Sequence, residues 1–230
     1  MTTEVGTTEF DPPGRRRYDN SRRAAQAGRT RDRVFRAAFA LFGEHGYART
    51  TLGAIAEHAD VPLETVRKIG SKRDLLDGAR LVGVFDTDQL DGILAADFMQ
   101  DVARAASFPE AVGVLVDFYA VSNARASAFW EAWQGAALQD PAVAEAWRDE
   151  MASAHDAFRT GVRYARSRGW LRPDVDDEEL AATLWVLVST ETHRRLTRDA
   201  GLDGEAYRRW LRRALLDQMA PQRLRPDHAG

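Results

Sequence analysis

The chain has 230 residues, of which 44% are hydrophobic and 29% charged, a composition typical of a globular protein. It contains no cysteine, which excludes disulfides and cysteine-based metal sites and agrees with a reducing compartment. The net charge of −3 argues by itself against nucleic acid, but residues 12–75 hold fourteen Lys and Arg against seven Asp and Glu. Residues 76–230 hold eighteen Lys and Arg against twenty-five Asp and Glu. A basic head on an acidic body predicts phosphate contact at one end; a merely solvated charged face is the alternative.

No segment of the sequence predicts secretion or membrane insertion. The N-terminus carries Glu4, Glu9 and Asp11 and has no apolar signal core. The longest apolar stretch, residues 180–188, is too short to span a bilayer. We therefore expect a cytoplasmic protein with no membrane partner.

Residues 1–28 are rich in arginine and have almost no apolar periodicity. They contain Pro-Pro-Gly at residues 12–14 and the arginines Arg15, Arg16, Arg17, Arg22 and Arg23. We expect a flexible arm. It either follows the DNA backbone or enters a minor groove, or it is a disordered extension that adds only nonspecific affinity.

Residues 29–75 predict three short helices in succession. One face of the first helix ends just before Gly46, the residue type that suits a left-handed C-terminal cap: Val34, Ala37, Ala38, Leu41, Phe42 and His45. Thr51 can cap a second helix with the inner face Leu52, Ile55, Ala56 and Ala59, and residues 63–68 make a third after a break at residues 60–62. Two short helices joined by a tight turn predict a helix-turn-helix DNA-binding head, the alternative being an ordinary helical hairpin.

Positions spread in order from residue 35 to residue 76 form a recognisable pattern: Phe35-Arg36-Ala37-Ala38, Leu41-Phe42, Gly46-Tyr47, Thr50-Thr51, Ile55-Ala56, Ala59, Val61, Thr65-Val66, Ser71-Lys72 and Leu75-Leu76. This pattern resembles the tetracycline-repressor (TetR) family of transcriptional regulators. The resemblance implies an N-terminal DNA-binding domain followed by a larger helical domain for ligand binding and dimerisation.

The sequence departs from the family pattern around the third helix. Asp60 stands where the family usually has glycine, a mild change because Asp tolerates a left-handed backbone. Pro62 replaces the usual Ser or Thr, which removes a side-chain cap but can start a helix at its first position. The family normally ends this helix with Tyr, two variable residues and Phe. Here either Ile69 replaces the Phe and the Tyr is deleted, or Arg67 replaces the Tyr and the Phe is lost.

The expected DNA contacts lie before the second helix, on the third helix and just after it. Thr50 and Thr51 stand where hydroxyl and N–H groups would meet a phosphate, although Thr51 can equally be a plain N-cap. Arg67 and Lys68 can donate to a guanine edge, or they are simply solvated cations. By the resemblance, Lys72 is a phosphate anchor. The complete expected set is Arg49, Thr50, Thr51, Leu63, Glu64, Thr65, Arg67, Lys68 and Lys72.

The body, residues 76–220 followed by a tail at 221–230, shows helical periodicity and no strand alternation. A helix from Leu75 links head to body, Pro109 opens another, and residues 124–138 carry aromatic side chains. Asp140 caps a helix that runs to Arg168. Two helices close the body, one capped by Asp176 or Asp177 and one after residues 201–204. The predicted fold class is therefore all-α.

The resemblance implies an effector pocket in the body, and aromatic side chains are its candidate walls, although each one taken alone suits an ordinary core better. The candidates are Phe85, Phe118, Tyr119, Phe129, Trp130, Trp133, Trp147, Phe158 and Trp185. His155 could add a polar group. The histidines lack metal-ligand spacing, so we expect neither a metal nor another cofactor.

By the same resemblance, the last two helices would form a dimer interface, although their apolar stripes also suit internal packing. The residues concerned are Leu180, Leu184, Leu187, Tyr207, Trp210, Leu211 and Leu215. We therefore expect a homodimeric regulator, most often a repressor in this family, that binds a palindromic double-stranded DNA operator and responds to a small-molecule effector. The alternative is a ligand-binding helical protein whose head has lost specific DNA recognition. No phosphate loop, metal spacing or nucleophile-base pair supports an enzyme.

Overall fold

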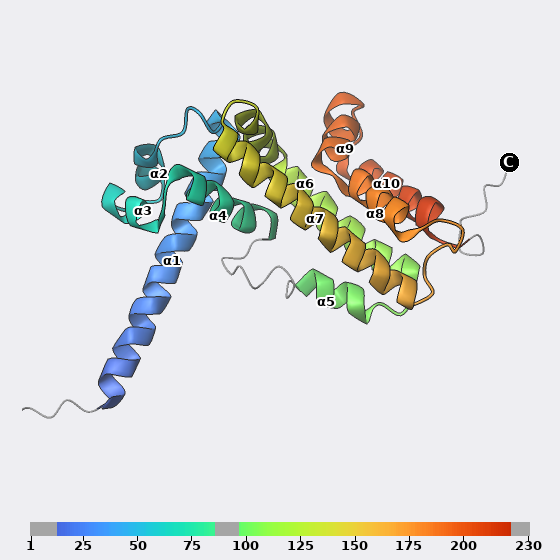
Figure 1. Cartoon of the computed structure of the whole chain (residues 1–230), viewed down its shortest axis with the longest axis horizontal. Coiled ribbons are helices and arrows are strands. Elements are labelled where there is room, and N and C mark those ends of the chain that lie inside the picture. The colour runs from blue at the N-terminus through green and yellow to red at the C-terminus, as the bar shows by residue number, and fades with distance from the viewer. Residues whose placement is uncertain (1–12, 86–96, 222–230) are drawn as a thin grey trace, which may run out of the picture.

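The computed structural model describes residues 13–85 and 97–221, which form ten α-helices, a short π-helical segment and no strand. The head consists of α1 (Pro13–His45), α2 (Leu52–His58), α3 (Leu63–Ile69) and α4 (Lys72–Phe85). The body consists of α5 (Asp97–Arg104), α6 (Phe108–Ala137), α7 (Pro141–Ser167), α8 (Asp177–Val188), α9 (Thr190–Arg194), η2 (Arg195–Asp199) and α10 (Gly204–Met219). Figure 1 shows the head and the body at opposite ends of the molecule. The predicted all-α class is confirmed.

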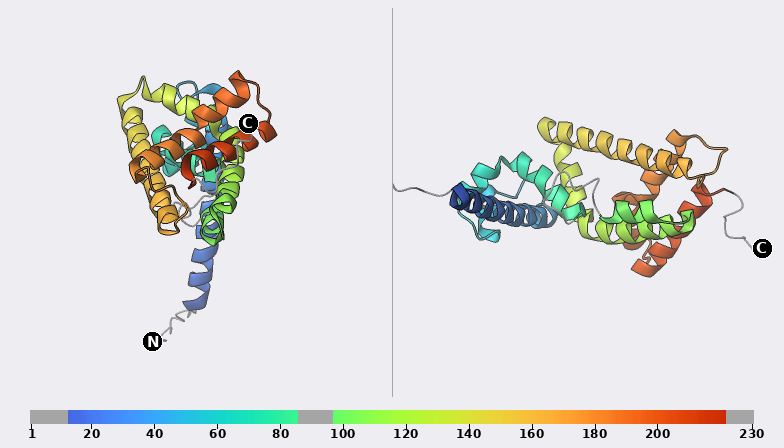
Figure 2. Two further views of the ribbon diagram at one scale, coloured as in Figure 1. Left: turned by 90° about the vertical axis from the view of Figure 1, so that its right-hand side faces the viewer. Right: turned by 90° about the horizontal axis from the view of Figure 1, so that it is seen from below.

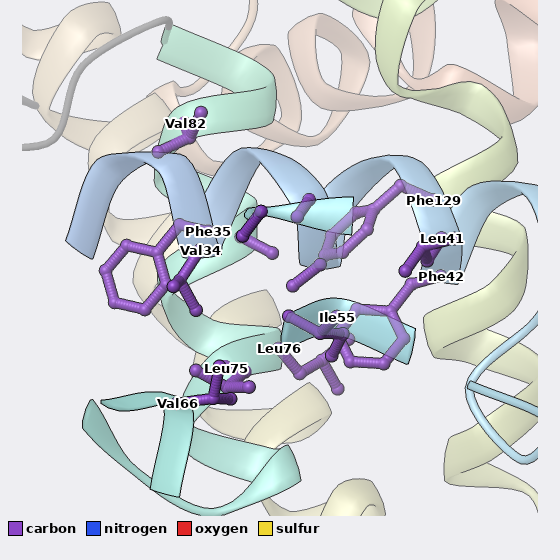
Figure 3. Close-up of a cluster of buried hydrophobic side chains, with 14 of the residues drawn as sticks. Val34, Phe35, Leu41, Phe42, Ile55, Val66, Leu75, Leu76, Val82 and Phe129 are labelled. Carbon is purple, nitrogen blue, oxygen red and sulfur yellow. The ribbon is translucent and has the colours of Figure 1, made fainter. Parts of the chain in front are cut away.

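One apolar cluster holds the four head helices together (Figure 3). Phe42 of α1, Ile55 of α2, Val66 of α3, and Leu75 and Leu76 of α4 are all fully buried in it. Burying one such side chain contributes about 1.5–3 kcal/mol. Helices of seven residues are not stable alone in water, so α2 and α3 depend on this cluster for both their stability and their orientation.

Helix α4 crosses α1 closely because two glycines make room for aromatic rings. A Cβ atom at Gly78 would overlap the ring of Phe35, and one at Gly83 would overlap the ring of Phe39. The crossing fixes the helix that leaves the head against the helix that enters it.

The N-terminal segment differs from the expected flexible arm. Helix α1 begins at Pro13, so residues 13–28 continue the helix that was expected to begin near residue 29. Proline suits the first helical turn, and the Arg, Ala and Gln residues of this segment are good helix formers. Apolar periodicity cannot reveal such a polar helix, because the helix has no apolar face. Figure 1 shows the first half of α1 extending away from the other helices; residues 1–12 lie outside the described residues.

Helices α6 and α7 form a long antiparallel pair that joins body to head (Figures 1 and 2). The two segments expected after Pro109 and over residues 124–138 are one continuous helix of 30 residues. Val112 and Val116 of α6 lie in the apolar cluster of the body, whereas Phe129 and Trp133 lie in that of the head. Helix α6 thus connects the two cores. None of the described helices is long and apolar enough to cross a membrane.

Side-chain caps begin α7 and α8 as predicted, but α8 ends earlier than expected. Asp140 accepts from the N–H of Ala142 at 2.9 Å, and Asp176 accepts from that of Glu179 at 2.8 Å. At Ser189 the backbone becomes extended, and this residue caps the additional helix α9. The side-chain amide of Asn123 donates to the carbonyl oxygen of Val188 at 2.8 Å and so holds the break from α6.

Candidate nucleic-acid interface and effector cavity

The turn between α2 and α3 has the geometry that a helix-turn-helix requires. The N–H of Asp60 donates to the carbonyl of Glu57 at 3.1 Å, and the N–H of Val61 donates to that of Ala56 at 3.0 Å. Asp60 has a φ of 52°, the left-handed conformation in which glycine is the usual residue. Aspartate is one of the few residue types that tolerates this conformation, so the departure at this position leaves the turn intact.

Helix α3 presents a polar face to solvent. Glu64, Arg67 and Lys68 are exposed, whereas Val66 is fully buried beneath them. Arg67 donates to Glu64 at 2.6 Å, an exposed pair of the kind that contributes about 0–1 kcal/mol. Breaking such a pair costs little, so both side chains are available to a partner that offers better geometry. Pro62 is the N-cap itself, and the helix begins one residue later, at Leu63.

The end of α3 favours one of the two alignments left open by the sequence. Ile69 packs against the apolar cluster of the head, whereas Arg67 points to solvent. Ile69 therefore takes the packing role of the aromatic residue that the family pattern places near this position. The shortened pattern leaves a helix of seven residues that is still anchored at its C-terminal end.

Residues Gly70, Ser71 and Asp74 make a compact joint between α3 and α4. The carboxylate of Asp74 accepts from the N–H of Ser71 at 2.7 Å and from its hydroxyl at 2.8 Å. These bonds hold the pKa of Asp74 below its ordinary value. A Cβ atom at Gly70 would approach that of Asp74 to 2.6 Å, so the joint requires glycine.

Lys72 supports the loop before α2. Its ammonium nitrogen lies 4.3 Å from the centre of the Tyr47 ring and donates to the carbonyl of Ala48 at 3.3 Å. Partial burial lowers the pKa of Lys72. Arg49 in the same loop is exposed, and its Nε donates to the carbonyl of His45 at 2.8 Å. The loop is therefore fixed from both sides.

Thr50 and Thr51 have different roles, which corrects the expectation for Thr50. The Thr50 side chain points inward, and its hydroxyl lies 3.0 Å from the carbonyl oxygen of Leu41 and 2.9 Å from that of Gly46. It closes the turn and is not available to a phosphate. Thr51 is exposed and caps α2 by accepting from the N–H of Ala54 at 3.1 Å. Adjacent hydroxyls with opposite orientations cannot be distinguished from sequence alone.

We expect Thr50→Val to destabilise the protein by about 0.5–1.5 kcal/mol, because it removes a buried hydroxyl donor without changing side-chain shape. Thermal unfolding of the purified protein measures this. Thr160→Val on α7 removes an exposed hydroxyl with a similar bond to a helix carbonyl and should change stability far less. Equal effects of the two substitutions would contradict the inward role of Thr50.

A cavity of about 150 Å³ lies where α4, α6, α7, α8 and the start of α9 meet. Five of the candidate aromatic residues line it: Tyr119, Trp130, Trp147, Phe158 and Trp185. They come from three consecutive helices, α6, α7 and α8. A concave, aromatic-walled space is the usual form of a small-molecule site.

The other aromatic candidates do not line this cavity. Phe129 and Trp133 are buried in the apolar cluster of the head, where they fill space between helices. Phe118 packs edge-on against Tyr119, with ring centres 5.1 Å apart. The side chain of Phe85 lies outside the described part of the structure. Aromatic content alone does not separate core from cavity wall.

The polar lining of the cavity could not be found from sequence spacing. Arg80 of α4 and Glu150 of α7 form an ion pair of 3.1 Å, with side-chain exposures of 16% and 15%. Burial raises the pKa of Glu150, and the nearby Arg80 opposes that rise. The other polar residues of the lining are Ser122, Asn123, Ser189, Thr190 and Glu191. The two residues are seventy positions apart in sequence, so the ion pair can be recognised only in the folded structure.

The structure contradicts most of the predicted dimer interface. The chain's own core buries Leu180, Leu184, Tyr207, Leu211 and Leu215, because α8 packs on α7 and α10, and α10 packs on α6 and α8. Leu187 and Trp210 are half-buried against the same cluster. On the outer side of α8, Val186 is 62% exposed.

Residues 34–78 match the family model described as bacterial regulatory proteins, tetR family. No curated protein matches the chain in sequence.

Solved structures resemble almost the whole chain. A TetR-family regulator from Rhodococcus sp. superposes with a TM-score of 0.65 at 17% identity, over 83% of this chain and 98% of its own. A transcriptional regulator from Saccharomonospora viridis, solved in complex with choline, superposes with a TM-score of 0.63 at 18% identity, over 84% of this chain and 98% of its own. SmeT, the repressor of a Stenotrophomonas maltophilia multidrug efflux pump, was solved with triclosan. It superposes with a TM-score of 0.62 at 21% identity, over 87% of this chain and 96% of its own. At sequence identities of 17–21%, these structural similarities establish the fold.

Proposed function

We propose that the chain, whose residues 34–78 match the model of bacterial regulatory proteins of the tetR family, represses transcription in the cytoplasm by binding a palindromic DNA operator as a homodimer. A small-molecule effector in the aromatic cavity would modulate that binding. The observation that carries the proposal is the polar face of α3, which stands exposed on a head whose turn, caps and core are complete. Two structural neighbours were solved with small molecules, choline and triclosan, which supports the effector role of the cavity.

The proposed DNA contacts follow the positions of the side chains. On α3, Arg67 and Lys68 would donate to guanine edges or phosphates, and Glu64 would accept from a cytosine amino group. Leu63 and Thr65 are half-buried on the same helix and would contact the groove at its edge. Arg49, Thr51 and Lys72 would contact the DNA backbone.

The cavity and the head are mechanically connected. Arg80 of α4 lines the cavity, and α4 follows directly after the recognition helix α3. Helix α6 joins the two cores. If an effector weakens DNA binding, DNA must weaken effector binding by the same factor. A hundredfold effect requires about 2.7 kcal/mol of differential binding.

Selection of bound duplexes from a random-sequence pool tests the DNA-binding role without knowledge of the target gene. The full chain should enrich a two-fold symmetric site whose half-sites are about one helical turn apart or more. Failure to enrich any sequence over the starting pool would contradict specific recognition.

The dimer proposed here would use the outer face of α8 rather than the buried stripe. We expect Val186→Glu to convert a dimer into a monomer, because it replaces an exposed apolar side chain by a charged one that a second copy would bury. Sedimentation velocity at micromolar concentration measures this. Leu138→Glu, at an 84% exposed residue after α6, is the matched control and should leave the dimer intact. A dimer that survives Val186→Glu would place the interface elsewhere.

A further inference from the structure

We propose that the effector is a small organic cation, such as a short quaternary ammonium compound, and that it replaces Arg80 as the partner of Glu150. This inference rests on the proposed function, since it names the ligand class of the regulator's own cavity. Its basis is the combination of aromatic walls, an excess of carboxylates and a hydroxyl without a partner in one small space.

The aromatic walls suit a cation. The rings of Trp130 and Trp147 lie 5.7 Å apart at 74° and form a corner, and those of Phe158 and Trp185 lie 6.5 Å apart at 21°. Tyr119 adds a fifth ring, 6.5 Å from Phe158. The face of an aromatic ring carries negative potential and attracts a cation within about 6 Å of its centre, by about 2 kcal/mol or more when water is excluded.

The charges of the lining favour the same ligand. The lining holds two carboxylates, that of Glu150 and that of the exposed Glu191, and one guanidinium, that of Arg80. Because Arg80 and Glu150 neutralise each other, Glu191 leaves the lining with a net negative charge. An incoming anion would have to compete with Glu150 for Arg80 beside ring faces that repel it.

Ser122 supplies a polar contact for the same molecule. This residue is 3% exposed and lines the cavity, and its hydroxyl oxygen has no hydrogen-bond partner among the described residues. Buried hydroxyls are normally paired. Because the oxygen itself is buried, a hydroxyl or carbonyl group on the ligand would bond to it only after the Ser122 side chain rotates towards the cavity.

The volume limits the size of the ligand. The cavity has a volume of about 150 Å³ and is partly open to solvent; a closed cavity of that volume accommodates a molecule the size of benzene. A trimethylammonium group with a short hydroxylated tail has a similar number of non-hydrogen atoms. Long-chain or multi-ring cations would require the cavity to expand.

Replacement of Arg80 by the ligand as the partner of Glu150 would change the position of the head. A ligand cation that pairs with Glu150 leaves the Arg80 guanidinium buried without its carboxylate, which is costly. Arg80 lies on α4, so this cost would be relieved by movement of α4 towards solvent. The movement would shift the recognition helix that precedes it.

Calorimetric titration of the full chain without DNA tests the ligand class. The probes are choline, its uncharged isostere 3,3-dimethylbutan-1-ol, and butyrate. Choline should bind saturably and at least about tenfold more tightly than the isostere, which is a difference in binding free energy of about 1.4 kcal/mol. Equal binding of the isostere, or binding of butyrate alone, would overturn the proposal, the latter in favour of an anion at Arg80.

Variants test the assignment of Glu150. Glu150→Gln should weaken choline binding at least about tenfold, whereas Glu145→Gln, an exposed residue of the same helix outside the lining, should not. If Glu150→Gln does not fold, Glu191→Gln at the exposed edge should still weaken binding severalfold. Unchanged choline affinity in the folded variants would overturn the assignment.

DNA binding is measured separately on the selected operator. Operator binding without any choline binding would refute this inference and leave the proposed function standing. Choline binding without operator binding would refute the proposed function and leave the ligand class standing. Choline should weaken operator binding by the wild-type protein but not by Glu150→Gln; an equal response of both would refute the partner exchange.

Discussion

Replacing Arg67 and Lys68 together with alanine lowers the affinity for the selected operator by about 30-fold or more, because one bidentate base contact is worth about 1–3 kcal/mol. The two side chains are exposed on α3, and the pair of Arg67 with Glu64 contributes little to stability. The fold should therefore be unaffected. Competition mobility shifts with labelled operator measure the affinity, and thermal unfolding verifies the fold.

The control removes the same amount of charge from the body. Arg163 of α7 and Arg198 of η2 are both exposed, and their double alanine variant should retain operator affinity within about threefold, since distant charges act only through a screened field. If the two double variants lose affinity equally, net charge rather than α3 determines binding. The α3 variant should also show a weaker dependence of affinity on salt wherever a phosphate contact is lost.

Trp133→Ala destabilises the protein by about 3–5 kcal/mol, the usual cost of removing a large buried aromatic side chain. Trp133 is 1% exposed and lies between Phe129, Trp130 and Trp147, with ring centres 5.9, 5.5 and 5.7 Å away. Trp130→Ala should cost clearly less, because the Trp130 ring is half-buried and borders the cavity. The urea concentrations at the midpoints of unfolding measure both effects.

Trp133→Phe separates the loss of packing from the loss of a polar group. The indole nitrogen of Trp133 has no hydrogen-bond partner among the described residues, so phenylalanine loses no bond and should recover most of the stability lost in alanine. Equal midpoints for Trp133→Ala and Trp130→Ala would contradict the placement of Trp133 in the core.

Local chemistry made the caps of α2 and α7 and the inner face of α2 predictable from sequence. Thr51 and Asp140 were identified as caps because hydroxyl and carboxylate caps act within three residues. The inner face of α2 was found because helical periodicity repeats within the helix itself. The polar first half of α1 was missed for the same reason, since it carries no apolar stripe.

Longer-range features could not be predicted. An apolar stripe such as that of Leu180 and Leu211 satisfies a chain's own core and a dimer interface equally, and only packing reveals which surface covers it. The same ambiguity placed Trp133 with the cavity candidates. Arg80 and Glu150 meet only because α4 and α7 are brought together by the fold.

The most direct test of the central claim is a mobility shift of the full chain on DNA fragments from around its own gene, across a series of salt concentrations. We expect one fragment to be bound in preference to the others, with an affinity that falls steeply as salt rises, because basic side chains displace counterions from phosphates. Weak and uniform binding to every fragment would contradict the claim that this protein is a sequence-specific repressor.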